Sequence, residues 1–370
     1  MIYLDNAATT MIKPVAVERA VLRAMHTMAS PGRGGHDPAM RAAEQVLSCR
    51  EAAARLFNVP DCERVVFTMN ATHALNIAIR SLAVPGSRVV VSGFEHNSVT
   101  RPLAELGAEI VIAAAPLFRP EALIEQFRKM LPGASLAVCT HVSNAFGYIL
   151  PIYEIAALCS ELEIPLIVDA SQSAGILDVD YAALGAAFIA MPGHKGLFGP
   201  QGTGVLICAQ EGKPLLSGGS GSDSVPQHMP DYLPDRLEAG THNVCGIAGL
   251  REGIAYVSAH GTGELLRHER ELLRQMAEEL SGIDELQLFY SGGDDQSGVL
   301  SLRSSALDCE DIAAGLNRSG IFVRSGLHCS PFAHRSVGTL RTGTVRFSFS
   351  PFVSPEDIDR TCARMAELLQ

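Results

Sequence analysis

Lys195 is the first residue whose setting points to chemistry. It follows a histidine and lies among glycines in the segment MPGHKGLFGPQGTGVL, residues 191–206. The apolar runs AAFIAM (186–191) and TGVLICA (203–209) predict buried strands on either side. An amine attacks an aldehyde only when it is unprotonated, and burial favours that form. Lys195 is therefore a candidate for a covalent bond to a carbonyl compound; the alternative is a solvated lysine in a glycine loop.

Polar side chains also follow other apolar runs, at the strand ends where open α/β sheets bind ligands. After RVVFT (64–68), Ala71 and Thr72 open a helix whose free N–H groups suit a phosphate. An ordinary helix cap would produce the same pattern. After RVVVSG (88–93) comes His96; an isolated histidine of this kind is more often structural than catalytic.

Two further strand ends carry an amide or a carboxylate. Asn144 follows LAVCTHVS (136–143), while Asp169 lies at the end of the run IPLIVDA (164–170) and Gln172 comes shortly after it. A carboxylate there lies in a poorly hydrated crevice, which costs free energy unless a cation meets it.

A single cofactor accounts for these positions together. Pyridoxal 5'-phosphate uses a lysine for its Schiff base, a carboxylate for its pyridine nitrogen, an anion-binding helix start for its phosphate and a flat group over its ring. Lys195, Asp169, Thr72 and His96 supply one of each. The sequence therefore predicts a pyridoxal-phosphate site built from residues far apart in the chain.

The elements that must position these residues alternate along the first two thirds of the chain. Apolar residues at helical spacing predict helices over 14–28, 38–59, 71–82 and 151–163. Short apolar runs predict strands over 64–68, 87–93, 135–143, 164–170, 186–191 and 202–209. Continuous apolar strands between helices are typical of a largely parallel sheet covered on both faces, so the predicted fold class is α/β.

The pattern changes after a Gly/Ser/Pro-rich passage at 217–235. A helical stretch over 246–281 is followed by predicted strands over 297–303, 320–326 and 343–349 and by helices over 309–318 and 355–369. These elements predict a second, smaller domain of mixed α and β structure.

Composition narrows the function classes. The 370 residues are 47% hydrophobic and carry a formal net charge of −11, with no basic cluster, which argues against a nucleic-acid partner. No signal peptide or membrane-spanning run is apparent, so we expect a soluble cytoplasmic protein without membrane partners. The nine cysteines are scattered, without a CxxC pair, and suggest neither a disulfide framework nor a metal site.

The ordered motifs resemble a fold-type-I pyridoxal-phosphate enzyme of the class V aminotransferase group, specifically the cysteine desulfurase and selenocysteine lyase family. They cover nearly the whole chain and are YLDNAATT, NATHALN, EHNS, HVSNAFG, VDASQSAG, GHKGLFGPQGTG, RLEAGTHN, VRSGLHCSP and GTVRFSFSPFVSPEDID. The resemblance implies a large cofactor-binding domain (15–249) and a small domain from both chain ends (1–14 and 250–370). It also implies a homodimer with sites at the interface.

The resemblance assigns roles by position. Lys195 matches the Schiff-base lysine, Asp169 the partner of the pyridine nitrogen and Gln172 that of the phenolic oxygen. His96 would stack on the ring and is a candidate for proton transfer. The remaining matches are Ala71, Thr72 and His194 for the phosphate, Thr241 for the phosphate of the other subunit, and Asn144 and Arg346 for the substrate carboxylate. Pro192 departs from the serine of SUF-type relatives, so phosphate contacts must differ there.

Cys329 decides among the reactions that pyridoxal phosphate supports. It lies in RSGLHCSP, where Arg324 and His328 are close in sequence and could stabilise a thiolate. A desulfurase needs a thiol that takes the sulfur of L-cysteine as a persulfide, releases alanine and passes the sulfur to an acceptor protein or small thiol. A transaminase needs none. The short cysteine segment is similar to the SUF-like group.

Two alternatives remain open at this point. Selenocysteine lyase uses the same framework on a substrate that differs by one atom. A class V aminotransferase or epimerase would not use Cys329.

Overall fold

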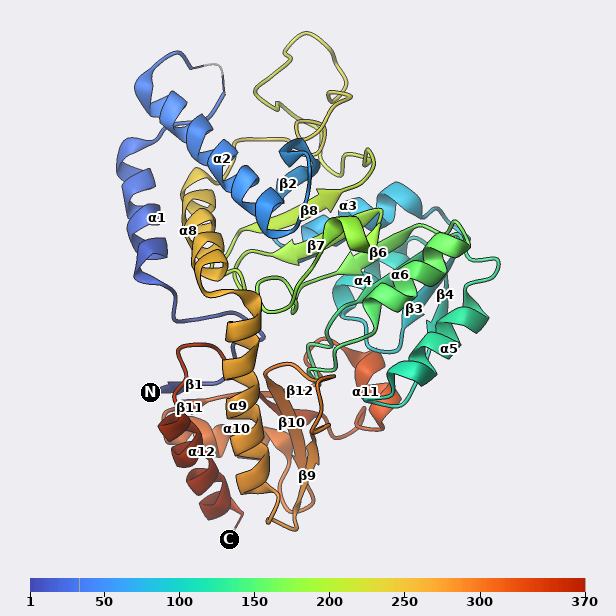
Figure 1. Cartoon of the computed structure of the whole chain (residues 1–370), viewed down its shortest axis with the longest axis vertical. Coiled ribbons are helices and arrows are strands. Elements are labelled where there is room, and N and C mark those ends of the chain that lie inside the picture. Colours follow the sequence, from blue (N-terminus) through green and yellow to red (C-terminus); the bar gives the residue numbers. More distant parts are fainter. Residues whose placement is uncertain (33, 370) are drawn as a thin grey trace.

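The computed structural model describes residues 1–32 and 34–369, and its larger part is built on a seven-stranded sheet (Figure 1). The strand order is β2-β8-β7-β6-β5-β3-β4. Strand β8 runs antiparallel to both of its neighbours, and the other adjacent pairs are parallel. The strands are β2 (Val65–Thr68), β3 (Arg88–Ser92), β4 (Glu109–Ala113), β5 (Leu136–Thr140), β6 (Leu166–Asp169), β7 (Phe188–Pro192) and β8 (Gly204–Cys208).

Helices cover both faces of this sheet, and side chains of each strand alternate between two cores. Val90 packs in one core, whereas its neighbours Val89 and Val91 pack in the other. The first core also contains residues of α2 (Asp37–Leu56), α5 (Pro120–Met130), α6 (Ile152–Glu161) and α8 (Val244–His260). The second contains residues of α3 (Ala71–Leu82) and α4 (Asn97–Glu105). Helix α1 (Val15–Thr27) packs against α8, and α7 (Tyr181–Leu184) and the 3-10 turn Cys62–Arg64 are short.

The smaller part holds a four-stranded antiparallel sheet of order β12-β13-β10-β9. These strands are β9 (Leu286–Phe289), β10 (Val299–Ser304), β12 (Arg324–Gly326) and β13 (Thr344–Ser348). Strands β9, β10 and β13 pack in one core with α9 (Thr262–Leu280), α10 (Cys309–Arg318) and α12 (Pro355–Leu368). β1 (Ile2–Tyr3) pairs in parallel with β11 (Ile321–Phe322), so both chain ends lie here (Figure 1). Helix α11 (Pro331–Val337) follows the cysteine segment.

The predicted α/β class with a mostly parallel sheet is confirmed, and two predicted elements are corrected. The helix expected over 246–281 is two helices, separated at Gly261, whose φ of 81° suits glycine and ends α8. The strand expected over 320–326 is two short strands, because its first half pairs with the N-terminal strand and its second half with β13. The domain division at residue 249 stays a prediction, and this position lies within α8.

No helix in residues 1–32 and 34–369 is both long and apolar enough to cross a membrane.

Candidate functional site

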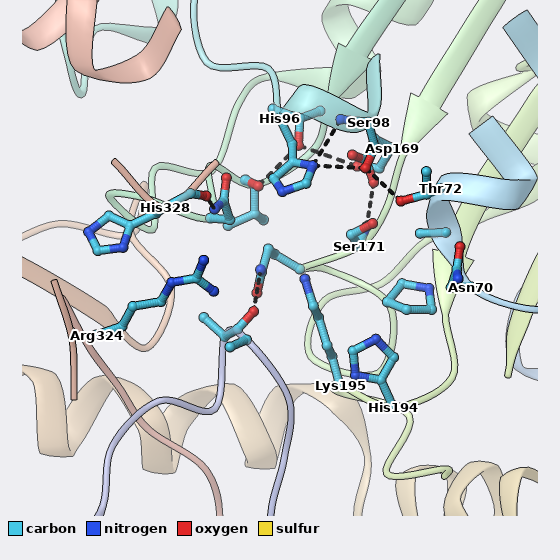
Figure 2. Close-up of a pocket in the computed structure, with 18 of the residues that line it drawn as sticks. Asn70, Thr72, His96, Ser98, Asp169, Ser171, His194, Lys195, Arg324 and His328 are labelled. Carbon is cyan, nitrogen blue, oxygen red and sulfur yellow. Dashed lines mark hydrogen bonds between the residues drawn. The ribbon is translucent and has the colours of Figure 1, made fainter. Parts of the chain in front are cut away.

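A pocket of about 190 Å³ lies at the carboxyl ends of β5, β6 and β7 (Figure 2). Thr140, Asp169 and Pro192, which end these strands, all line it. The structure brings together the following predicted site residues in its wall: Ala71, Thr72, His96, Asn144, Asp169, Gln172, His194, Lys195 and Arg346. Cys329 and Thr241 are not among the lining residues.

Lys195 is held by close backbone packing of the segment between β7 and β8. A Cβ atom at Gly193 would lie 2.2 Å from Oγ1 of Thr203, and one at Gly196 would lie 2.5 Å from the carbonyl oxygen of Ala174. Both distances are far below van der Waals contact, so only glycine fits at either position. The glycines around Lys195 therefore serve the packing that presents its side chain to the pocket.

The charge state of Lys195 follows from its surroundings. The pKa of its amine is lowered from 10.5 to about 8, mainly by burial; Asp169 opposes this shift, and the positive charges of Arg346 and Arg324 add to it. At pH 7 this raises the unprotonated fraction from roughly one in three thousand to about one in ten. The environment thus makes Lys195 a nucleophile near neutral pH.

Asp169 is the acidic group of the pocket and lies at the end of β6. Its side chain is buried, with 2% of the residue exposed, and Oδ1 accepts a hydrogen bond from the backbone N–H of Ser171 at 2.9 Å. Figure 2 shows Asp169 and His96 across the pocket from Lys195 and His194. The carboxylate is therefore placed to meet a positive charge on a ligand bound between them.

His96 is a neutral ring with a defined tautomer. It precedes α4, and its Nδ1 accepts the backbone N–H of Ser98 at 3.0 Å, so the ring hydrogen is on Nε2. The pKa of His96 is lowered to about 4, mainly by burial; Asp169 opposes this shift, and the charges of Lys195 and Arg324 add to it. A neutral flat ring can lie against a planar ligand without repelling a cation.

The N-terminus of α3 forms one end of the pocket. Asn70 precedes the helix, and its Oδ1 accepts the backbone N–H of His73 at 2.9 Å. The N–H groups of Ala71 and Thr72 belong to the first turn and have no acceptor within the helix, which makes them donors for an anion. The hydroxyl groups of Thr72 and Ser98 are 2.8 Å apart and add further polar atoms.

The side chains of His194 and Gln172 contact the N-terminal segment of the chain. Nδ1 of His194 is 3.0 Å from Oγ1 of Thr9, and Nε2 of Gln172 donates to the carbonyl oxygen of Ala7 at 2.9 Å. Burial, aided by the charge of Lys195, lowers the pKa of His194 to about 4, so this ring is also neutral. Both side chains line the pocket and retain donor capacity toward it.

Arg346 is a buried cation with hydrogen-bonding capacity to spare. Only 1% of the residue is exposed, Nη1 donates to the carbonyl oxygen of Asn144 at 2.9 Å, and Nη2 donates to Oδ1 of Asp5 at 2.6 Å. Its Nε–H has no partner among the described residues. An arginine that lines a pocket with an unused donor suits a carboxylate ligand.

Cys329 is exposed on a tight turn beside the pocket, which we call the cysteine loop (residues 326–330). Nη2 of Arg324 is 3.6 Å from its Sγ atom, and Arg324 and His328 themselves line the pocket. Burial is the main cause that lowers the pKa of His328 well below its ordinary value, so the positive group at the sulfur is Arg324. Arg324 is thus close to the thiol in the structure as well as in the sequence.

Thr241 lies apart from this pocket, on an exposed segment that is held by a buried ion pair. Glu238 bonds to Arg50 at 2.8 Å and to the backbone N–H of Phe67 at 2.6 Å, and His242 is 2.6 Å from the same carboxylate. Thr241 lines a second pocket of about 200 Å³. Its assignment to the site of another subunit stays a prediction.

Several residues of the site were not predicted from the sequence. Asp5 lies in the quoted YLDN motif, but its ion pair with Arg346 joins positions 341 residues apart and leaves no local signal. Asn70 could have been found as the N-cap residue three positions before His73. The other missed lining residues are Ala7, Ala8, Ser98, Thr140, Val142 and Ser171.

The residues present fit pyridoxal 5'-phosphate. The pocket offers a lysine with a lowered pKa, a buried carboxylate opposite it, two neutral histidines and a helix N-terminus. Pro192 offers no donor, so the phosphate end relies on the neighbouring amides and hydroxyls. The α/β fold and this pocket define a pyridoxal-phosphate enzyme of fold type I.

Comparisons with known proteins agree with this class. The aminotransferase class-V family model matches residues 2–361. A probable cysteine desulfurase of Methanothermobacter thermautotrophicus is 34% identical and covers 96% of this chain and 92% of its own. A solved cysteine desulfurase of Thermococcus onnurineus NA1 is 30% identical over 100% of this chain and 94% of that one, with a TM-score of 0.91. One from Escherichia coli is 26% identical over 99% and 94%, with a TM-score of 0.88. The chain belongs to the aminotransferase class-V family.

Proposed function

We propose that this chain is a pyridoxal-phosphate-dependent cysteine desulfurase, which converts L-cysteine to L-alanine and carries the sulfur on Cys329. The observation that carries the proposal is an exposed thiol with an arginine 3.6 Å away, on a loop at the wall of a lysine-centred pocket. Relatives named cysteine desulfurase or probable cysteine desulfurase from three archaea match it over at least 92% of their own length, which favours this reaction over an aminotransferase or epimerase.

Each cofactor contact follows from the chemistry of the residue. Lys195 would bond to the aldehyde and Asp169 would meet the pyridine nitrogen. His96 would lie against the ring, and Gln172 would donate to the phenolic oxygen. The phosphate would take the N–H groups of Ala71 and Thr72 and the ring of His194. Bound there, the cofactor supplies an electron sink for the α-carbon of an amino acid.

The chain's own residues would then bind the substrate and move protons. Arg346 and Asn144 hold the α-carboxylate, and Lys195 accepts the α-proton through its free amine. The thiolate of Cys329 attacks the sulfur of L-cysteine: an S–S bond forms, and the C–S bond breaks with its electron pair left on carbon. One thiol proton ends on that carbon, with His96 as a carrier, and the other stays with the persulfide. The proton on Lys195 returns to the α-carbon, so alanine and a cysteine persulfide balance the reaction.

The sulfur must next leave the enzyme. The persulfide on Cys329 would pass to an acceptor thiol, on a protein or a small molecule, and the exposure of Cys329 permits such an encounter. We place the enzyme in the cytoplasm, where its nine unpaired cysteines would stay reduced. We further propose a homodimer in which Thr241 reaches the phosphate of the partner.

The test is incubation of the purified protein, loaded with pyridoxal phosphate, with L-cysteine. The proposal expects alanine and protein-bound sulfane sulfur in equal amounts during the first turnover. A parallel incubation with L-selenocysteine measures the preference between the two substrates. Formation of pyruvate or a keto acid without bound sulfur would refute the desulfurase proposal in favour of a lyase or transaminase.

A further inference from the structure

The side chain of Asn144 is shared between the pocket and the cysteine loop. Its Nδ2 donates to the carbonyl oxygen of His328 at 2.7 Å, and its Oδ1 accepts the hydroxyl of Ser330 at 2.5 Å. These three residues are buried, whereas Cys329 between His328 and Ser330 is exposed. One amide group thus bridges the two residues that flank the thiol.

The orientation of this amide is fixed by what its neighbours can do. A backbone carbonyl only accepts hydrogen bonds, so Nδ2 must face His328 and Oδ1 must face Ser330. The Ser330 hydroxyl therefore donates. Asn144 lines the pocket, and Nδ2 carries a second hydrogen that neither neighbour uses. That hydrogen is the donor that Asn144 can offer to a carboxylate.

The loop needs such contacts because its backbone is in an unfavourable conformation. The φ angles of His328 and Cys329 are 51° and 58°, in the left-handed region that L side chains rarely adopt. Successive residues in this region persist only where the surroundings hold them. Besides the bridge, the N–H of Asn97 donates to the carbonyl oxygen of Cys329 at 2.8 Å. Asn144 thus donates to the carbonyl group of His328 and Asn97 to that of Cys329, and of these two residues Asn144 lines the pocket.

The bridge is also tied to the buried arginine. Nη1 of Arg346 donates to the backbone carbonyl of Asn144 at 2.9 Å, so the two groups that would hold a carboxylate are directly linked. A ligand that accepts the free hydrogen of Asn144 polarises its amide, which makes Oδ1 a stronger acceptor for the Ser330 hydroxyl.

We propose that Ser330 is a positioning residue that couples binding of an amino acid's α-carboxylate to the placement of the Cys329 thiol, through the Asn144 amide. The proposal rests on the desulfurase function proposed above. Carboxylate binding strengthens the hydrogen bond from Ser330 to the Asn144 amide and fixes the thiol where the substrate's sulfur arrives. A ligand whose carboxylate does not reach Asn144 leaves the cysteine loop less firmly held.

The test compares Ser330→Thr with Ser330→Val in the loaded enzyme, because these side chains have the same size and differ in the hydroxyl. The rate of Cys329 alkylation by iodoacetamide is followed by peptide mass spectrometry, with and without saturating L-alanine. Binding of L-alanine is followed separately by the visible spectrum. The matched control is Ser336→Ala, which removes a hydroxyl of α11 that donates to Gly93 instead.

The proposal expects the threonine variant and the control to behave like the wild type, with labelling slowed by L-alanine. The valine variant should be labelled about tenfold faster, as expected for the loss of one buried hydrogen bond, and L-alanine should protect it less although it still binds. With L-cysteine, the valine variant should show both a raised KM and a lowered kcat. If the Ser330→Val variant does not retain the cofactor, the Cys329 labelling rates of Ser330→Ala and of the wild type are compared instead.

Equal labelling and equal protection in the threonine and valine variants would overturn the coupling, because simple shielding by the ligand acts on both alike. This outcome is separate from failure of the proposed function. A wild type that binds L-alanine but releases none from L-cysteine would refute the desulfurase reaction, while the labelling comparison would still decide the role of Ser330.

Discussion

At the scale of single residues, burial reduces the positive charge that the side chains of the site carry. Lys195, His96 and His194 would each carry a positive charge at a sufficiently low pH, but burial lowers the pKa of the amine to about 8 and of both rings to about 4. At neutral pH both rings are therefore neutral and part of the Lys195 amine is free, while Arg346 and Arg324 stay fully charged. These lie on the substrate and cysteine side rather than on the ring side.

The lowered pKa of Lys195 makes a prediction about cofactor loading. Only the free amine reacts, so the rate at which cofactor-free protein bonds to pyridoxal phosphate should rise about tenfold per pH unit below 8 and level off above it. The visible absorbance band reports the reaction. Lys195→Ala should give no band, whereas Lys213→Ala, at an exposed lysine, should match the wild type. A rate that keeps rising to pH 10 would mean that the amine is not perturbed.

At the scale of elements, the ends of β3 and β5 are joined through a buried carboxyl group, that of Glu95. Oε1 of Glu95, after β3, accepts the hydroxyl of Ser92 at 2.5 Å and the backbone N–H of Thr140, at the end of β5, at 2.9 Å. Oε2 has no partner among the described residues. Burial, with a smaller contribution from Asp169, raises the pKa of Glu95 to about 8. This group is therefore mostly protonated at pH 7.

Glu95 should make the stability of the fold depend on pH. Its pKa is raised from 4.5 in the unfolded chain to about 8, so the unfolded state releases its proton first. The free energy of unfolding should fall between pH 5 and 8, by roughly 3 to 5 kcal/mol at most. Glu95→Gln keeps the accepting oxygen and cannot ionise, and urea titrations at pH 5, 7 and 9 should show a flatter profile. Parallel profiles for the two proteins would show that Glu95 does not titrate in this range.

Local signals predicted the elements well where a cap or a break marks them. The helix 71–82 and the helix 309–318 begin and end as predicted, because Asn70 and Asp308 precede them and the apolar spacing continues to their ends. The segment 320–326 could not be divided from sequence, because its first half pairs with Ile2 and Tyr3. Contacts between distant parts of the chain leave no periodic pattern.

The same limit applies to the site. Lys195, Asp169 and Arg346 were predicted, because strand ends and the resemblance mark their positions, and the structure places them in one pocket. The ion pair of Arg346 with Asp5 was not predicted, since the two residues meet only after both chain ends have folded. The partners of Asn144 in the cysteine loop are similarly distant, at separations of 184 and 186 residues.

At the scale of the whole molecule, the two parts of the chain meet at the pocket. Asp169 comes from β6 of the large sheet and Lys195 from the segment between β7 and β8. Arg346 comes from β13 of the small sheet, and Asp5 from the N-terminal segment. The buried network of Glu238 fixes the neighbouring segment that carries Thr241. Exposed apolar side chains occur in α1, in α2 and in the segment before α1, at Met11, Ile12, Val15, Leu22, Met25, Met40 and Leu47.

The proposed homodimer predicts that Thr241 acts in the site of the partner. Thr241→Val removes one donor to the phosphate and should weaken retention of pyridoxal phosphate about tenfold, while the protein stays dimeric. Equilibrium dialysis of the cofactor and sedimentation of the protein measure the two effects. Thr27→Val on α1, at an exposed threonine, is the matched control. A monomer with unchanged cofactor retention would contradict both the dimer and the role of Thr241.

Sulfur transfer through Cys329 is the central claim, and Cys329→Ser tests it most directly. The variant should load the cofactor and change its visible spectrum on binding L-cysteine, because neither step uses the thiol. Alanine release and protein-bound sulfane sulfur should both be lost, whereas the wild type forms them in equal amounts. The same change at a buried cysteine, Cys159→Ser, should leave sulfur transfer in place. Alanine release by Cys329→Ser at the wild-type rate would contradict the account.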